Sequence, residues 1–123
     1  MGFVKERLII IFDKNQTMDF LSEGSHTYYV YIITNNNRTV LYTGVTNHLH
    51  RRLWQHLNKF NPKSFSAKYN VYQLLYYEKY SWIQQAIERE KEIKNLTRLK
   101  KWEMIKSVNP RLEFLNHLFE YKG

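Results

Sequence analysis

Cysteine is absent from the 123-residue sequence. This absence excludes disulfides, thiolate zinc sites and a cysteine nucleophile, and it removes any positive argument for an oxidising compartment. Long apolar runs are missing as well, because the longest one covers only residues 8–12. That run is far shorter than the ~20 residues that span a bilayer, and shorter than the roughly 7-residue apolar region of a signal peptide. We therefore expect a cytosolic (cytoplasmic) protein with no membrane partner.

Acidic residues are missing from a long internal segment, since none occurs from Gly24 to Tyr77. The whole chain has 19 Lys and Arg against 11 Asp and Glu, a net charge of +8, and residues 26–123 alone carry a net +9. A positive field of this kind attracts a polyanion, and the 16% of aromatic residues add surfaces on which bases can stack. The charge pattern favours a nucleic-acid partner; the alternative is a basic protein without one.

Residues 1–25 differ from the rest of the chain. A short apolar, strand-like run is followed by turn-forming residues at 13–16 and by the stretch Ser-Glu-Gly-Ser at 22–25, so we interpret this part as an N-terminal appendage. No internal repeat or low-complexity linker follows. With 43% hydrophobic and 24% charged residues, the composition is that of an ordinary globular domain, which we expect over residues 26–123.

Three segments have the residue pattern of β-strands. Residues 28–34 and 39–43 are rich in β-branched and aromatic side chains, and they are separated by three asparagines at 35–37. Asparagine tolerates the positive φ that a tight turn requires, so the two strands are predicted to form a hairpin. A third strand is predicted over residues 71–77.

A first helix is predicted after Gly44, with Thr46 or Asn47 as its N-cap and Pro62 at its end. Apolar residues recur in it at helical spacing: Leu49, Leu53, Leu57 and Phe60.

Two further helical segments follow the third strand. Ser81 begins a Ser-x-x-Gln capping box that opens a helix over residues 82–96. Another helical piece, around residues 99–107, stops before Asn109-Pro110. The element order ββαβαα predicts an α+β fold, in which helices flank a small, mainly antiparallel three-stranded sheet.

Glu90 occupies an unusual position in the helix predicted over residues 82–96. At 100° per residue it lies in the middle of the apolar stripe, whereas Glu88 and Glu92 point to the opposite side. A carboxylate that faces a core is costly unless it is protonated, paired with a cation or bound to a metal. The alternatives are a buried salt bridge to an arginine, or a stripe wide enough to leave Glu90 at its edge.

Arg52 and His56 lie one turn apart, at the margin of the apolar stripe of the first helix. From there a guanidinium fork and an imidazole can project together and reach one phosphate. The alternative is an exposed Arg/His pair with no function.

The order and spacing of these residues resemble a known family. Tyr29-Val30-Tyr31 is followed after ten residues by Tyr42-Thr43-Gly44, then by Arg52 and His56, and this pattern resembles the GIY-YIG nuclease superfamily, especially its small stand-alone members of uncharacterised role. The wider likeness extends over about residues 27–116 through several blocks: 41–47, 51–52, Phe65 with Lys68-Tyr69, 76–78, 86–94 and Asn109-Pro110. Departures from the family pattern are Tyr29 in place of glycine, His48 in place of aspartate and Ser64 in place of glycine.

The resemblance implies a role for each matching residue. Tyr31 and Tyr42 become the two motif tyrosines, Arg52 the phosphate-binding arginine and His56 the helix histidine. Glu90 becomes the single carboxylate that binds a divalent metal ion, Mg²⁺ or Mn²⁺, and Asn109 the late asparagine of several branches. Tyrosine, with an ordinary pKa of about 10, needs a nearby cation to act as a base at neutral pH. Proton relay through His56 or Lys68 is the other option.

The implied function is that of a metal-dependent endonuclease that hydrolyses phosphodiester bonds in nucleic acid, DNA in particular. The main alternative is a nucleic-acid-binding module of the same fold without significant turnover. A third is a structural or protein-interaction role with a vestigial metal site. The sequence indicates no particular protein partner.

Overall fold

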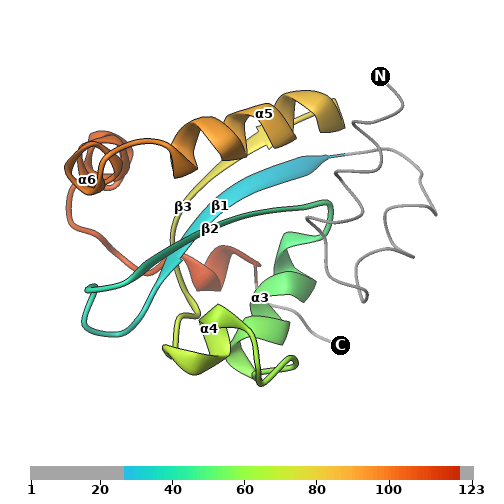
Figure 1. The fold of residues 1–123 in the computed structure, drawn as a ribbon, viewed down its shortest axis with the longest axis vertical. Helices are drawn as coiled ribbons and strands as arrows, with labels where there is room; N and C mark the ends of the chain where they lie inside the picture. Colours follow the sequence, from blue (N-terminus) through green and yellow to red (C-terminus); the bar gives the residue numbers. More distant parts are fainter. Residues whose placement is uncertain (1–26, 120–123) are drawn as a thin grey trace.

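Three strands form one sheet in the order β2-β1-β3, and both pairs are antiparallel. They are β1 (Tyr28–Thr34), β2 (Leu41–Thr46) and β3 (Gln73–Tyr80). The computed structural model describes residues 27–119, and these residues form the α+β fold shown in Figure 1. The predicted fold class is therefore confirmed, with no parallel pair in the sheet of the described chain.

Helices cover both faces of this sheet. The helices are α3 (Leu49–Leu57), α4 (Phe65–Lys68), α5 (Ile83–Lys94) and α6 (Arg98–Val108), and a 3₁₀ helix, η1, covers Asn116–Phe119. In Figure 1, α5 runs along one side of the sheet, and α3 and α4 lie on the other. Within residues 27–119, no helix combines the length and the apolar character needed to cross a membrane.

The central strand β1 contributes to two separate cores. Val30 and Ile32 pack with residues of α5 and α6, whereas Tyr31 and Ile33 pack with Leu49 and others on the α3 side. Successive side chains of a strand point to opposite faces, so a strand buried on both faces is apolar throughout. This explains why residues 28–34 show no polar alternation.

The predicted hairpin is present, although its turn differs in detail. The Asn35 side chain accepts hydrogen bonds from the backbone N–H groups of Thr39, at 2.8 Å, and Val40, at 3.0 Å. Arg38, and none of the three asparagines, adopts the positive φ, of 58°. Its guanidinium lies 4.0 Å from the centre of the Phe114 ring, and this contact ties the turn to the C-terminal segment.

The first helix is shorter than its apolar spacing indicates. It ends at Leu57 rather than just before Pro62, and the side chains of Leu57 and Phe60 are 54% and 50% exposed. The chain reverses at Lys59, which has a φ of 51°, so Phe60 leaves the helical stripe. The predicted N-cap was also wrong: His48 occupies that position, and Thr46 instead accepts a bond from its N–H at 3.1 Å.

The third strand and the last two helices begin or end at other residues than the sequence predicted. Trp82 is the N-cap of α5 and makes no side-chain capping bond, so the capping box predicted from Ser81 was wrong. In α6 the Thr97 hydroxyl caps the helix by accepting from the N–H of Lys100 at 3.2 Å. The third strand is shifted to Gln73–Tyr80. The short helices α4 and η1 were not predicted, and the proposed appendage of residues 1–25 lies outside the described residues.

Candidate functional site

A hydrogen bond between Tyr31 and His56 joins β1 to α3. The Tyr31 hydroxyl lies 2.9 Å from Nε2 of His56, and the two side chains are only 1% and 3% exposed. The other ring nitrogen, Nδ1, lies 2.7 Å from the Ser66 hydroxyl of α4, which is itself 3.2 Å from the hydroxyl of Ser64. A buried chain of hydroxyl, imidazole and hydroxyl groups therefore fixes the orientation of the Tyr31 phenol.

Gly44 makes room for this phenol. Gly44 pairs with Tyr31 across β1 and β2, and the Tyr31 ring lies over the glycine. A β-carbon at Gly44 would lie 2.5 Å from the oxygen and 2.6 Å from Cζ of Tyr31. The glycine that follows Tyr42-Thr43 is thus required by the close approach of the Tyr31 ring.

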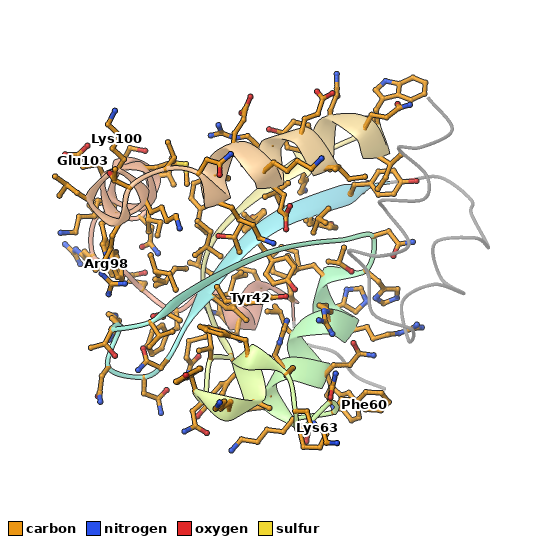
Figure 2. The ribbon with its side chains drawn as sticks, viewed as in Figure 1. Tyr42, Phe60, Lys63, Arg98, Lys100 and Glu103 are labelled. Atoms are coloured by element: carbon orange, nitrogen blue, oxygen red, sulfur yellow. The ribbon has the colours of Figure 1, made fainter. Side chains whose placement is uncertain are left out.

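Tyr42 completes an aromatic cluster around His56. It pairs with Ile33, so it projects from the same sheet face as Tyr31. Its ring centre lies 6.4 Å from that of Tyr31 and 5.6 Å from that of His56. Figure 2 shows Tyr42 on the side of the sheet where α3 and α4 lie. Because Tyr42 is half-buried whereas Tyr31 is buried, it is the motif tyrosine that solvent can reach.

His56 is neutral at physiological pH. Burial, together with the nearby positive charge of Arg52, lowers its pKa from 6.5 to about 3. A neutral imidazole has one N–H donor and one acceptor nitrogen, which matches its two hydroxyl partners. His56 therefore holds Tyr31 through hydrogen bonds rather than through charge.

The two cations predicted for the site come from α3 and α4. The half-buried Arg52 donates from Nη1 to the side-chain oxygen of Gln55 at 3.1 Å, and its effect on His56 places its charge near that ring. Lys68 is exposed, and its ammonium lies 5.8 Å from the centre of the Tyr69 ring. Both positive charges thus lie on the sheet face that carries Tyr42.

Glu90 is buried in α5, as its helical position predicted, with 2% exposure. Its cation partner is a lysine rather than an arginine: Nζ of Lys94, one turn later, lies 2.5 Å from Oε2. The same Oε2 atom is shielded from solvent and has no well-oriented hydrogen bond. Glu88 and Glu92 are exposed, as predicted.

The structure brings Glu90 to the sheet from the opposite face. Tyr31, Tyr42 and His56 are in direct contact on the α3 side, whereas α5 packs against β1 and β2 from the other side. The meeting of Glu90 with the tyrosines in one site therefore stays a prediction.

The donor set for a metal ion is limited. Within residues 27–119, no cluster of three or more His, Asp or Glu side chains could hold an ion. The buried Oε2 atom of Glu90, which pairs with Lys94 but has no well-oriented hydrogen bond, fits a hard cation that takes its other ligands from water and substrate oxygens. Lys94 is half exposed, so its flexible side chain can make way for such an ion.

Asn109 uses its side-chain amide to hold backbone groups. Its Nδ2 donates to the carbonyls of Leu75 and Glu113, both at 2.9 Å, and its Oδ1 accepts from the N–H of Glu113 at 3.0 Å. These bonds fasten the segment after α6 to β3. They give Asn109 a structural role, and a catalytic one stays a prediction.

Ser66 is the site residue that the sequence did not reveal. It lies next to Phe65 but matches no block of the family pattern, and an isolated serine in a polar stretch carries no periodic signal. Only the folded position of α4 brings its hydroxyl to His56.

A separate cavity of about 670 Å³ lies along β3, and its lining includes neither Tyr31 nor Tyr42. Next to it, the Glu78 carboxylate accepts hydrogen bonds from the hydroxyls of Tyr76 and Tyr80 and from the Arg89 guanidinium, whose Nε is 2.9 Å away. Although burial raises the pKa of Glu78, these hydrogen bonds outweigh burial and lower it overall. All four residues are engaged with one another, so this network fastens α5 to β3.

A comparison with protein-family models agrees with the sequence pattern. Residues 27–103 match the family model described as the GIY-YIG catalytic domain. Among solved structures, the chain is similar to the solution NMR structure of the UPF0213 protein BH0048 from Bacillus halodurans. The two share 25% sequence identity over 68% of this chain and 86% of that one, with a TM-score of 0.44. No curated protein sequence matches the chain significantly.

Proposed function

The chain belongs to the GIY-YIG catalytic domain family, and from this premise we propose that it is a metal-dependent endonuclease that hydrolyses phosphodiester bonds in nucleic acid, DNA in particular. The observation that carries the proposal is the contact of both motif tyrosines with a buried, neutral His56. Aromatic residues that merely fill a core need neither a glycine against the ring, as Gly44 lies against Tyr31, nor a histidine at the hydroxyl, as His56 is.

The charge distribution supports a phosphate substrate. Residues 27–77 contain no acidic side chain, so β1, β2, α3 and α4 carry none. On the sheet face with Tyr42, α3 and α4 therefore contribute cations and no carboxylate, and this charge attracts a polyanion.

Each residue of the cluster has a distinct task in this proposal. Arg52 grips the non-bridging phosphate oxygens and holds them more tightly as negative charge builds up in the transition state. Tyr42 meets the attacking water, because it is the accessible tyrosine. Tyr31 and His56 are positioning residues, since both are buried and hydrogen-bonded to each other.

Glu90 would hold the divalent ion, Mg²⁺ or Mn²⁺. When bound, such an ion supplies electrostatic stabilisation of the oxygen that leaves the phosphate. β2 is an edge strand of the described sheet and packs against α5, so we place the reacting phosphate at this edge, where the two faces meet. Lys94 pairs with the Glu90 carboxylate, and its ammonium would have to move aside for an ion to bind there.

A comparison of binding with cleavage tests the proposal against the alternative of a binding module. Arg52→Ala and Tyr42→Phe should each lower the cleavage rate by about 10²-fold or more, because each removes a group that acts in the transition state. Binding to the same DNA should weaken only slightly, since one phosphate contact among several is lost.

Matched controls are Tyr72→Phe, which removes a hydroxyl bonded to Asn36, and Arg111→Ala, which removes an exposed charge. Both should cleave at the wild-type rate. A wild-type protein that binds DNA but never cleaves it faster than the Arg52 and Tyr42 variants would favour the binding module.

A further inference from the structure

A series of aromatic rings leads from the site to the protein surface. The ring of Phe65 stacks on that of Tyr42 with a centre distance of 5.9 Å and an interplanar angle of 26°. The ring of Tyr69 follows, 4.7 Å from Phe65. Phe65 and Tyr69 are 44% and 45% exposed, so both rings leave part of their surface open to solvent.

Cations accompany these rings. Lys68, between Phe65 and Tyr69 in the sequence, places its ammonium 5.8 Å from the Tyr69 ring centre. Lys59 and Lys63 lie on the exposed connection between α3 and α4, and Figure 2 shows Lys63 on this side of the molecule. Since residues 27–77 include no carboxylate, nothing in these elements repels an anion.

We propose that Phe65 and Tyr69 form a stacking site for an unpaired base of the substrate, with Lys68 at the phosphate of that nucleotide. Exposed rings beside lysines match the two parts of a nucleotide, a flat base and a charged phosphate. Bases in a duplex already stack on their neighbours and offer no free face, so the site selects single-stranded or branched DNA. A protein partner would fit the rings but not the excess of lysine.

The inference rests on the proposed function, because Tyr42 belongs both to the aromatic series and to the nuclease site. A nucleotide stacked on Phe65 therefore lies beside the accessible motif tyrosine. The substrate class follows: DNA with unpaired bases next to the bond that is cleaved.

Binding of two DNA probes tests this inference. Fluorescence anisotropy is measured at one salt concentration with a single-stranded oligonucleotide and with a duplex of the same length. Stacking contributes about 1–3 kcal/mol per base, or roughly 5- to 150-fold in affinity. Phe65→Leu and Tyr69→Leu should each weaken single-strand binding by at least about 5-fold and change duplex binding by less than about twofold.

Two control variants show whether a loss of binding comes from base stacking on Phe65 and Tyr69. Trp82→Leu removes a 65% exposed ring at the start of α5 and should change neither affinity. Lys68→Gln should weaken binding to both probes, with the salt dependence of log K reduced by about one phosphate contact. An equal loss on both probes for the ring variants, or no loss on either, would overturn the stacking site.

Cleavage of a single-stranded oligonucleotide, a branched DNA and supercoiled plasmid by the wild-type protein is measured in parallel. If the protein cleaves and the leucine variants bind single strands normally, the stacking site is refuted while the nuclease stands. If the leucine variants lose single-strand binding selectively and no DNA is cleaved, the stacking site stands and the nuclease is refuted.

Discussion

The buried histidine should make the stability of the protein depend on pH in a defined window. In the unfolded chain His56 takes up a proton as the pH falls below 6.5, whereas in the folded protein it does so only near its lowered pKa of about 3. The unfolded state therefore binds more protons between these values. The stability conferred by the neutral ring is complete above pH 6.5 and is lost as the pH falls through this window.

The magnitude follows from the pKa values. Each pH unit over which the two states differ in protonation changes the free energy of unfolding by about 1.4 kcal/mol. Between pH 6.5 and pH 5 the wild-type protein should lose about 2 kcal/mol through His56 alone. Asp and Glu begin to take up protons mainly below pH 5, so histidines dominate this interval; His50, whose pKa burial and the charge of His48 also lower, adds to the loss.

Urea unfolding at pH 7.5 and pH 5 measures this loss in the wild-type protein and in His56→Gln. Glutamine keeps polar atoms for Tyr31 but does not titrate, so His56→Gln should lose about 2 kcal/mol less than the wild type over the same interval. His117→Gln, at an exposed histidine of η1, is the control. An equal loss in the wild type and in His56→Gln would refute the account of His56 as buried and neutral.

Further predictions concern packing, ion pairing and binding. Gly44→Ala forces the buried Tyr31 ring to move and should cost about 1–3 kcal/mol, with a thermal unfolding midpoint lower by roughly 4–8 °C per kcal/mol; an unchanged midpoint would show that the ring yields freely. Glu78→Gln leaves Arg89 without its main partner and should cost about 1–3 kcal/mol in urea unfolding, whereas unchanged stability would mean that the network contributes nothing. Affinity for duplex DNA should fall with salt at a log–log slope of about −0.9 per phosphate contact, and a flat response would contradict a basic binding surface.

The sequence predicted those features that depend on local pattern. β1 was predicted correctly because its residues are apolar on both faces, and the burial of Glu90 because helical spacing places it among isoleucines. The Lys94 partner at i+4 was available from the same spacing, but an arginine was expected.

Features that depend on tertiary contacts were missed. The reversal at Lys59 that ends α3, and the position of Ser66 at His56, arise only when α4 packs against α3. The bonds of Asn109 to Leu75 likewise join residues far apart in the chain. No periodicity in the sequence encodes such contacts.

The central claim is that Glu90 serves a divalent ion during phosphodiester hydrolysis, and nicking of branched DNA by Glu90→Gln tests it most directly. The substitution keeps the size of the side chain and removes its charge, and Glu88→Gln, at an exposed carboxylate of the same helix, is the matched control. We expect the wild type and Glu88→Gln to nick branched DNA with Mg²⁺ or Mn²⁺ but not in EDTA. Glu90→Gln should remain folded but inactive under all of these conditions. Nicking by Glu90→Gln at the wild-type rate, or wild-type nicking that continues in EDTA, would show that Glu90 is only the structural partner of Lys94.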